Sequence, residues 1–192
     1  MKLTKYTKLS LLVILFNGLM GCASNPIQAE LYLLRSDITS NVSTEIDTTK
    51  IRLNTVKVAS YIDQSGLVLQ TTDGQVNVAR YHRWAEPLKY GLTSYLAKGI
   101  SLSSGKYVHI SRLSSDKSQK TKIDVFIDQM HGTADGKAAL SATWTITVEN
   151  KGAKSYKFSN IKELNENGYP ALVESQKILL GEFAKEIAES IQ

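Results

Sequence analysis

The first 22 residues constrain this chain most, because they combine a basic start, a short apolar run and the chain's only cysteine. The first eight residues contain three lysines, Lys2, Lys5 and Lys8, and no acid. Residues 9–16 (LSLLVILF) are apolar apart from one serine. This order is typical of an export signal. A run of about eight residues cannot cross a bilayer core, which needs roughly 20 helical residues. We therefore expect residues 1–21 to be a cleaved signal peptide.

The end of this signal resembles the lipobox of bacterial lipoproteins. Leu19, Met20 and Gly21 precede Cys22, with leucine at position −3 and a small residue at −1. The resemblance implies that the Cys22 thiol carries diacylglycerol, that cleavage falls before it, and that the new N-terminus is acylated. An ordinary signal peptide with an incidental cysteine is the alternative. Ala23 at position +2, in place of Asp, implies sorting to the outer membrane by resemblance to Gram-negative lipoproteins.

Loss of the signal changes the charge and leaves a chain long enough for one domain. The 171 remaining residues can bury a sizeable core, and the formal charge falls from +5 to +2 because three lysines leave. No basic run interleaved with aromatics remains, so we expect no nucleic-acid partner. Residues 22–29 are expected to be a short tether, spanning at most about 25 Å from residue 23 onward. Residues 30–192 form the expected domain.

Short strands are expected in the first half of this domain. Apolar runs at residues 30–34 and 51–58 predict strands, separated by a polar loop at 36–50. Two further strands are expected at residues 67–71 and 75–80. They flank Thr72-Asp73-Gly74, and an Asp-Gly pair between two such runs is typical of a β-hairpin. In the strand at 51–58 we expect two alternating faces, with Ile51, Leu53 and Thr55 on one and Arg52, Asn54 and Val56 on the other.

Two amphipathic helices are expected. The first is opened by Trp84-Ala85-Glu86-Pro87-Leu88, with the proline at the first helical position, and Gly99 is its expected C-cap. The second begins at Pro170 and carries one apolar stripe to the C-terminus. That stripe is expected to pack on the sheet, and a contact with a subunit or partner is the alternative. Trp84 is expected to staple the first helix to the sheet, with a partner contact as its alternative.

Period-two alternation returns at Tyr107 and predicts an antiparallel meander. Its expected strands lie at residues 107–110, 123–127, 140–148 and 155–159, with turns at Asp135-Gly136 and Asn150-Lys151-Gly152. Trp144 is expected in the core. The predicted fold is therefore α/β, of an α+β-like kind. It is a mixed, largely antiparallel sheet packed by two main helices, in one domain after the signal peptide.

The chain offers no pattern of catalytic or metal-binding residues. Its three histidines, His82, His109 and His131, lie outside any nucleophile or zinc motif and lack the spacing of a ligand pair. With Cys22 acylated, neither a disulfide nor a cysteine metal site is expected. We therefore expect no catalytic residue, no metal and no cofactor besides the covalent lipid on Cys22, and the protein is expected not to be an enzyme.

Nearly all of residues 22–192 resemble the ABC-type transport auxiliary lipoprotein family. The order and spacing of several segments carry the resemblance, and Trp84-Ala85-Glu86-Pro87-Leu88 is the most specific of them. The family often has proline where this chain has Ala59, and Arg-Pro where it has Gln64-Ser65. The other segments are Tyr32-Leu33-Leu34, residues 51–58, Tyr61-Ile62-Asp63, Ile123-Asp124-Val125, Asp135-Gly136, Leu140-Ser141-Ala142-Thr143-Trp144 and the last helix.

This resemblance implies a non-enzymatic outer-membrane lipoprotein in an MCE-type intermembrane lipid transport system. Its implied partners are a periplasmic MCE-domain tube protein and that protein's inner-membrane component, and homo-oligomeric rings are implied as well. The segment from Trp84 to Leu88 is then either structural or a partner contact. The alternative is a periplasmic lipid carrier with its own apolar cavity.

Overall fold

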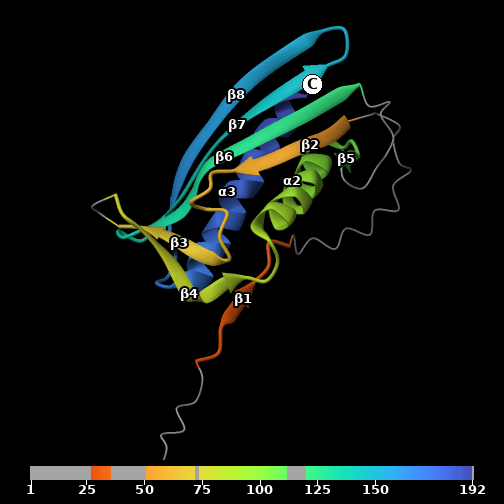
Figure 1. The fold of residues 1–192 in the computed structure, drawn as a ribbon. Coiled ribbons are helices and arrows are strands. Elements are labelled where there is room, and N and C mark those ends of the chain that lie inside the picture. The colour runs from red at the N-terminus through yellow and green to blue at the C-terminus, as the bar shows by residue number, and fades with distance from the viewer. Residues whose placement is uncertain (1–26, 36–50, 72–73, 112–119, 192) are drawn as a thin grey trace, which may run out of the picture.

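The computed structural model describes residues 27–35, 51–71, 74–111 and 120–191. Within these ranges eight strands form one mixed sheet, and two long helices cover one of its faces (Figure 1). This confirms the expected mixed α/β fold with two main helices. The elements are β1 (Glu30–Tyr32), β2 (Ile51–Val58), β3 (Gly66–Gln70), β4 (Val76–Trp84), α2 (Leu88–Ser104), β5 (Val108–Ile110), β6 (Thr121–Thr133), β7 (Lys137–Val148), β8 (Gly152–Glu163) and α3 (Tyr169–Ser190).

Strand β6 is the centre of the sheet because three strands pair with it. One of its edges carries β7, antiparallel to it, along almost the whole length. Its other edge is shared by two parallel strands: β2 pairs with residues 121–127 and β3 pairs with Gly132 and Thr133. The sheet continues from β3 through antiparallel β4 to parallel β1, and from β2 to parallel β5. Most paired residues nevertheless belong to antiparallel ladders.

The meander of β6, β7 and β8 confirms the strongest strand pattern in the sequence. Gly136 has a φ of 76° in the first turn, and Asn150 and Gly152 have φ of 63° and 90° in the second. These left-handed conformations suit glycine and asparagine, which are the residues present. Strand β8 is longer than the expected 155–159, because polar residues occupy both faces near its ends and the alternation does not mark them.

Two details of the expected strands are wrong. A β-bulge between Leu53 and Thr55 shifts the register of β2 against β6, so Val56 and not Thr55 follows Leu53 into the core. The strand expected at 107–110 is real, but β5 pairs in parallel with β2 and lies outside the meander. The expected hairpin is confirmed by the pairing of β3 with β4. Its turn residues 72–73, like the expected loop 36–50, lie outside the described residues.

Both ends of α2 differ from the expectation. Pro87, with φ −52° and ψ 125°, is the N-cap residue and precedes the first helical residue. The C-cap is Gly105, whose φ of 67° provides the left-handed conformation. Gly99 lies inside the helix instead, where a Cβ atom would come 2.8 Å from the Cβ of Ala184 on α3. The glycine is therefore required by close packing of the two helices.

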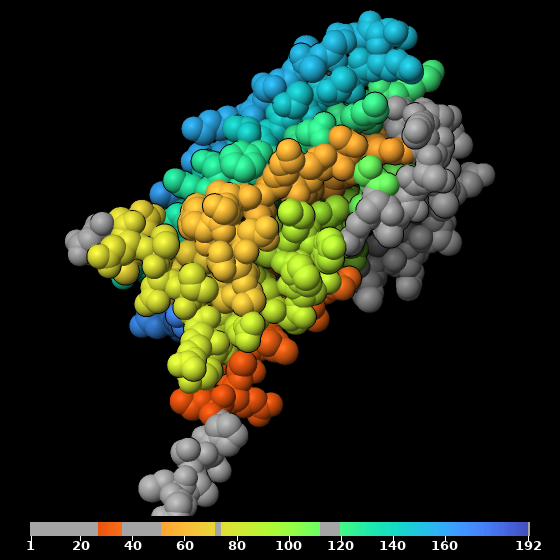
Figure 2. Space-filling model, viewed as in Figure 1, coloured from red at the N-terminus to blue at the C-terminus, as the bar shows by residue number. Residues whose placement is uncertain are grey.

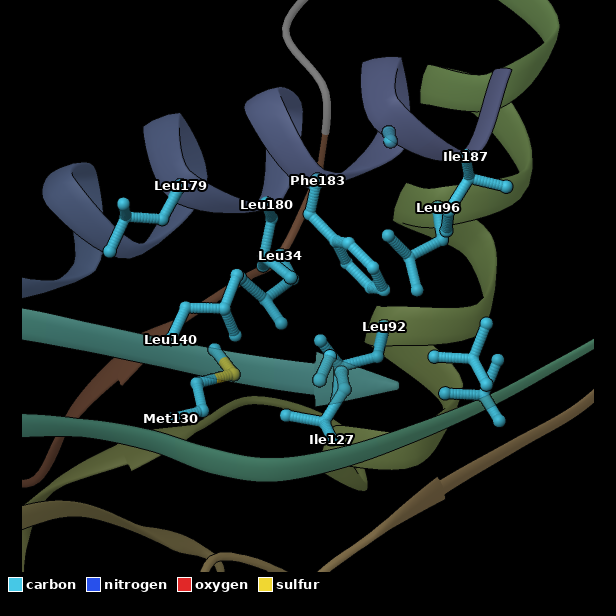
Figure 3. Packing of buried hydrophobic residues seen from close by; sticks show 14 of the residues in the cluster. Leu34, Leu92, Leu96, Ile127, Met130, Leu140, Leu179, Leu180, Phe183 and Ile187 are labelled. Carbon is cyan, nitrogen blue, oxygen red and sulfur yellow. The ribbon is translucent and has the colours of Figure 1, made fainter. Parts of the chain in front are cut away.

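The apolar stripe of α3 packs against the sheet and α2, as predicted. Phe183 is fully buried, with its ring centroid 5.5 Å from that of Trp144 and 5.3 Å from that of Phe158. Figure 3 shows Phe183, Leu92 and neighbouring side chains filling the space between the helices and the strands. Trp144 is buried as expected, and its indole N–H donates to Ser190 Oγ at 3.0 Å.

Candidate functional site

The predicted lipidation site lies just outside the described residues. Leu19, Met20, Gly21 and Cys22 all precede residue 27, so their roles stay predictions. The first described residue, Ile27, follows Cys22 by five positions. The described chain enters the folded body at β1.

Strand β1 is fixed to the body through its main chain. It pairs in parallel with the end of β4, with Tyr32 opposite Trp84, and the Ala85 N–H donates to the Tyr32 carbonyl at 2.8 Å. Leu34 is buried against the first turn of α2, where a Cβ on Gly91 would lie 3.3 Å from Leu34 Cβ. Glycine at position 91 therefore allows close packing between Leu34 and α2. The N-terminal segment is thus connected directly to both β4 and α2.

The motif from Trp84 to Leu88 forms the junction of β1, β4 and α2. Trp84 and Leu88 are buried in the core, and the Trp84 N–H donates to the Ser65 carbonyl at 2.7 Å. Glu86 accepts a hydrogen bond from Arg35 Nη2 at 3.3 Å. Only 8% of the Trp84 surface is exposed, so its ring staples helix and sheet together and is not available to a partner.

A cluster of polar rings ties β1 to α3 at the same junction. The imidazole of His82 stacks on the ring of Tyr169 with centroids 4.1 Å apart, and its Nδ1 lies 3.0 Å from the Tyr32 hydroxyl. That hydroxyl donates to Glu30 Oε2 at 2.7 Å. Burial, followed by this hydrogen bond to Glu30, raises the pKa of Tyr32 to about 12. The phenol therefore stays protonated at physiological pH and acts as a link, not as a base or nucleophile.

The two other histidines do not join this cluster. His131 is buried on β6, with Nδ1 3.1 Å from the Gly132 carbonyl oxygen and its ring tilted against Tyr61. His109 on β5 meets the ring of Tyr107 edge to face. Among the residues that the structure describes, no three His, Cys, Asp or Glu side chains gather closely enough to hold a metal ion.

The side chains of β1 divide into a buried and an exposed set. Tyr32 and Leu34 point into the body, whereas Leu31 and Leu33 are 64% and 46% exposed. Ile27, before the strand, is 68% exposed. The sequence marks residues 30–34 only as a short apolar strand, and the alternation within it is the signal that could have separated the two sets. Within the described ranges, no helix is both long and apolar enough to span a membrane.

A shallow depression lies where these elements meet. Its walls come from β1, the Trp84–Leu88 junction and the first turn of α2. It lies over close-packed side chains and is far smaller than an acyl chain. Its lining residues are Tyr32, Leu34, Trp84, Glu86, Leu88 and Gly91.

Comparisons with known proteins agree on one family. Residues 32–188 match the profile of the ABC-type transport auxiliary lipoprotein component. The chain is 26% identical over 176 residues to the intermembrane transport lipoprotein PqiC of Escherichia coli (strain K12), which covers 91% of this chain and 90% of that protein. PqiC of Shigella flexneri gives the same values.

Two solved structures share the fold. A crystal structure of an uncharacterized protein superposes with a TM-score of 0.73 at 22% identity, over 86% of this chain and 99% of its own. A protein from Xanthomonas campestris superposes with a TM-score of 0.64 at 15% identity, over 83% and 93%. At these identities the two likenesses establish the arrangement of strands and helices.

Proposed function

Because the chain belongs to the ABC-type transport auxiliary lipoprotein family, we propose that it is the docking component of an MCE-type intermembrane lipid transport system. In this role the lipid on Cys22 anchors the body to the periplasmic face of the outer membrane. A periplasmic MCE-domain tube protein, joined to its inner-membrane component, delivers or collects lipid there. The observation that carries the proposal is that the family match begins at Tyr32, ten residues after the lipobox cysteine. The name of its relative PqiC, an intermembrane transport lipoprotein, supports the same role.

The proposed role is one of position and not of catalysis. A tether of a few residues keeps the body close to the bilayer. Strand β1 joins that tether to the body by pairing with β4 and by accepting a hydrogen bond from Ala85, between β4 and α2. The titratable side chains beside β1 support this assignment, because Tyr32 is held protonated and His82 is engaged between Tyr32 and Tyr169. A non-enzymatic docking protein needs this rigidity at its attachment point and a surface for its partner.

Two exposed side chains of similar accessibility allow the partner-facing surface to be tested. Phe126 is 43% exposed on the sheet face opposite the helices, and Leu102 is 41% exposed on α2. A photo-crosslinking amino acid at each position in intact cells will capture whatever touches either face. Recovery of an MCE-domain protein supports the proposal, and the position that gives more of this crosslinked product identifies the docking face. Recovery of peptidoglycan enzymes alone would refute it.

The anchor is tested separately with Cys22→Ala. This variant is expected to leave the membrane fraction, remain in the periplasm as a soluble protein and lose its support of outer-membrane integrity. Lys2→Gln is the matched control, because it changes the signal without touching the lipobox. Normal function of the soluble Cys22→Ala form would contradict a tethering mechanism.

The carrier alternative needs an apolar cavity that can hold an acyl chain. The space between α2, α3 and the sheet is instead filled by side chains around Phe183 and Leu92 (Figure 3). Native mass spectrometry of the purified protein distinguishes the two functions. Stoichiometric phospholipid in addition to the acyl groups on Cys22 would favour a carrier, and protein free of it would favour the docking role.

A further inference from the structure

The exposed face of β1 continues onto the neighbouring strand. Pairing places Leu31 directly beside Arg83 of β4, so their side chains lie on the same face of the sheet. Tyr81, two residues earlier in β4, also lies on this face and is 36% exposed. We call Ile27, Leu31, Leu33, Tyr81 and Arg83 the β1 surface. It contains three aliphatic side chains, an aromatic ring with a polar tip, and a cation.

The charge around this surface is positive. The Arg80 guanidinium lies over the Tyr81 ring, 5.6 Å from its centroid, and Arg83 donates to the uncharged Ser65 hydroxyl at 3.0 Å. The acid on β1 itself, Glu30, lies on the opposite side of the strand with Tyr32 and His82. The two arginines therefore border the apolar residues without an ion pair to Glu30.

The β1 surface lies close to the predicted anchor. Ile27 follows Cys22 by five residues, which reach at most about 18 Å when extended and about 12 Å on average when flexible. Figure 2 shows that the segment containing β1, in red and orange, forms one end of the molecule. Figure 1 places the turn between β7 and β8 at the opposite end.

We propose that the β1 surface rests on the membrane that holds the lipid anchor, with an anionic phospholipid bilayer as its ligand. Aliphatic side chains enter the boundary between headgroups and acyl chains, tyrosine sits at headgroup level, and arginines attract anionic headgroups. This inference depends on the proposed lipidation of Cys22, because a short tether raises the local concentration of membrane to millimolar values. A patch of this size then needs little affinity of its own.

This contact would orient the body. A tether alone allows the domain to tumble, whereas a second contact formed by β1 holds one end of the molecule against the bilayer. The turn between β7 and β8 would then point into the periplasm, towards a partner arriving from the inner membrane. The inference thus adds a membrane-facing side and a partner-facing side to the proposed docking role.

Fluorescent probes at matched leucines can test the contact on the full lipoprotein. Leu33 and Leu102 are the same residue type with similar exposure, 46% and 41%. Leu102 lies 14 residues into α2, about 21 Å along the helix from its start. Leu31→Cys, Leu33→Cys and Leu102→Cys each introduce one free thiol, because acylation blocks Cys22. Each variant is labelled with an environment-sensitive dye and reconstituted into vesicles of phosphatidylethanolamine and phosphatidylglycerol.

Brominated phospholipids are expected to quench the labels at Leu31 and Leu33 about threefold more than the label at Leu102. The reason is that the first two labels would lie about 5–10 Å into the membrane interface. Replacing phosphatidylglycerol by phosphatidylcholine is expected to reduce this difference. Equal quenching at the three positions, on protein whose acylation is verified by mass, would overturn the membrane contact and leave the anchor intact. A blue-shifted label without bromine quenching would assign the surface to protein and overturn it too. Protein without acyl groups would refute both anchor and contact.

Discussion

The contact between α2 and α3 at Gly99 makes a sharp prediction about stability. A Cβ at this position would lie 2.8 Å from Ala184 Cβ, 0.6 Å inside the 3.4 Å limit of ordinary contact. Ala184 is fully buried and its Cβ is fixed to the helix backbone, so the two helices must separate. Gly99→Ala gains about 1 kcal/mol of helix propensity, but overpacking costs about 1–3 kcal/mol. We expect a net destabilisation of about 1 kcal/mol.

Gly181 provides the matched control on α3. A Cβ at Gly181 would meet no atom of another element within 4 Å, so Gly181→Ala should stabilise the protein by about 1 kcal/mol. Both variants are measured by thermal unfolding in a Cys22→Ala background, in which no acyl chain interferes. For a chain of this length, 1 kcal/mol corresponds to a shift in Tm of about 2–4 °C. The two substitutions should therefore move Tm in opposite directions.

A double-mutant cycle isolates the contact itself. Ala184→Gly removes the opposing methyl group, so Gly99→Ala should be stabilising when introduced into the Ala184→Gly variant. The coupling free energy should lie at about 0.5–3 kcal/mol, the range for residues in direct contact. If Gly99→Ala instead stabilises as much as Gly181→Ala, with no coupling to Ala184, the two helices do not meet at Gly99 and the packing argument fails.

Three further predictions concern single side chains. Phe183→Ala should lower the free energy of unfolding by about 3–5 kcal/mol, measured in urea, because the ring is fully buried between aromatic partners. The hydrogen bond from Lys137 lowers the pKa of Asp135 from 3.8 to about 2. The stability from this pair should therefore be present above pH 3.8 and disappear as the pH falls towards 2, and Lys137→Met should raise the pKa in an NMR titration. The pKa of Tyr32 is raised from 10.0 to about 12. The contribution of the protonated Tyr32 to the free energy of unfolding should therefore be complete below pH 10 and lost between pH 10 and 12. Ultraviolet titration of the phenolate checks this, and Glu30→Gln should lower that pKa.

Local patterns in the sequence were enough to predict the long elements of this fold. Helix α3 is marked by an apolar stripe along most of its length, and the centres of β6 and β7 are marked by alternating apolar residues, which reflects burial on one face. The hairpin of β3 and β4 is similarly marked by its turn. These features depend on neighbours in the chain, so one sequence is sufficient to find them.

Pairing between distant segments could not be predicted in the same way. Nothing local indicates that β2 and β3 share one edge of β6, or that β5 joins β2 and not the meander. The role of Gly99 was misassigned for the same reason, since its requirement for glycine comes from Ala184, 85 positions later. Likewise the bulge in β2, which turns Val56 inward, appears only against β6.

The candidate site combines both kinds of information. The proposed lipobox can be predicted from sequence because lipidation of this kind depends on consecutive residues ending at Cys22. The attachment of β1 is not, because a three-residue strand contributes few ladder hydrogen bonds and depends on contacts from other elements. Tyr32 is hydrogen-bonded to His82, whose ring stacks on Tyr169, and Leu34 packs against the first turn of α2.

This arrangement gives the Trp84–Leu88 motif a mechanical explanation. In the proposed docking role, a pull on the tether would reach β1 first, which is joined to β4 by strand pairing and to the segment before α2 by the hydrogen bond from the Ala85 N–H to the Tyr32 carbonyl. Trp84 is the last residue of β4, which pairs with β1, and Pro87 is the N-cap of α2. With Trp84 and Leu88 buried at this junction, the motif would keep the attachment point folded if a partner docks on the proposed tethered form. The exposed side of β1 is then free to face the bilayer, while its buried side holds the body together.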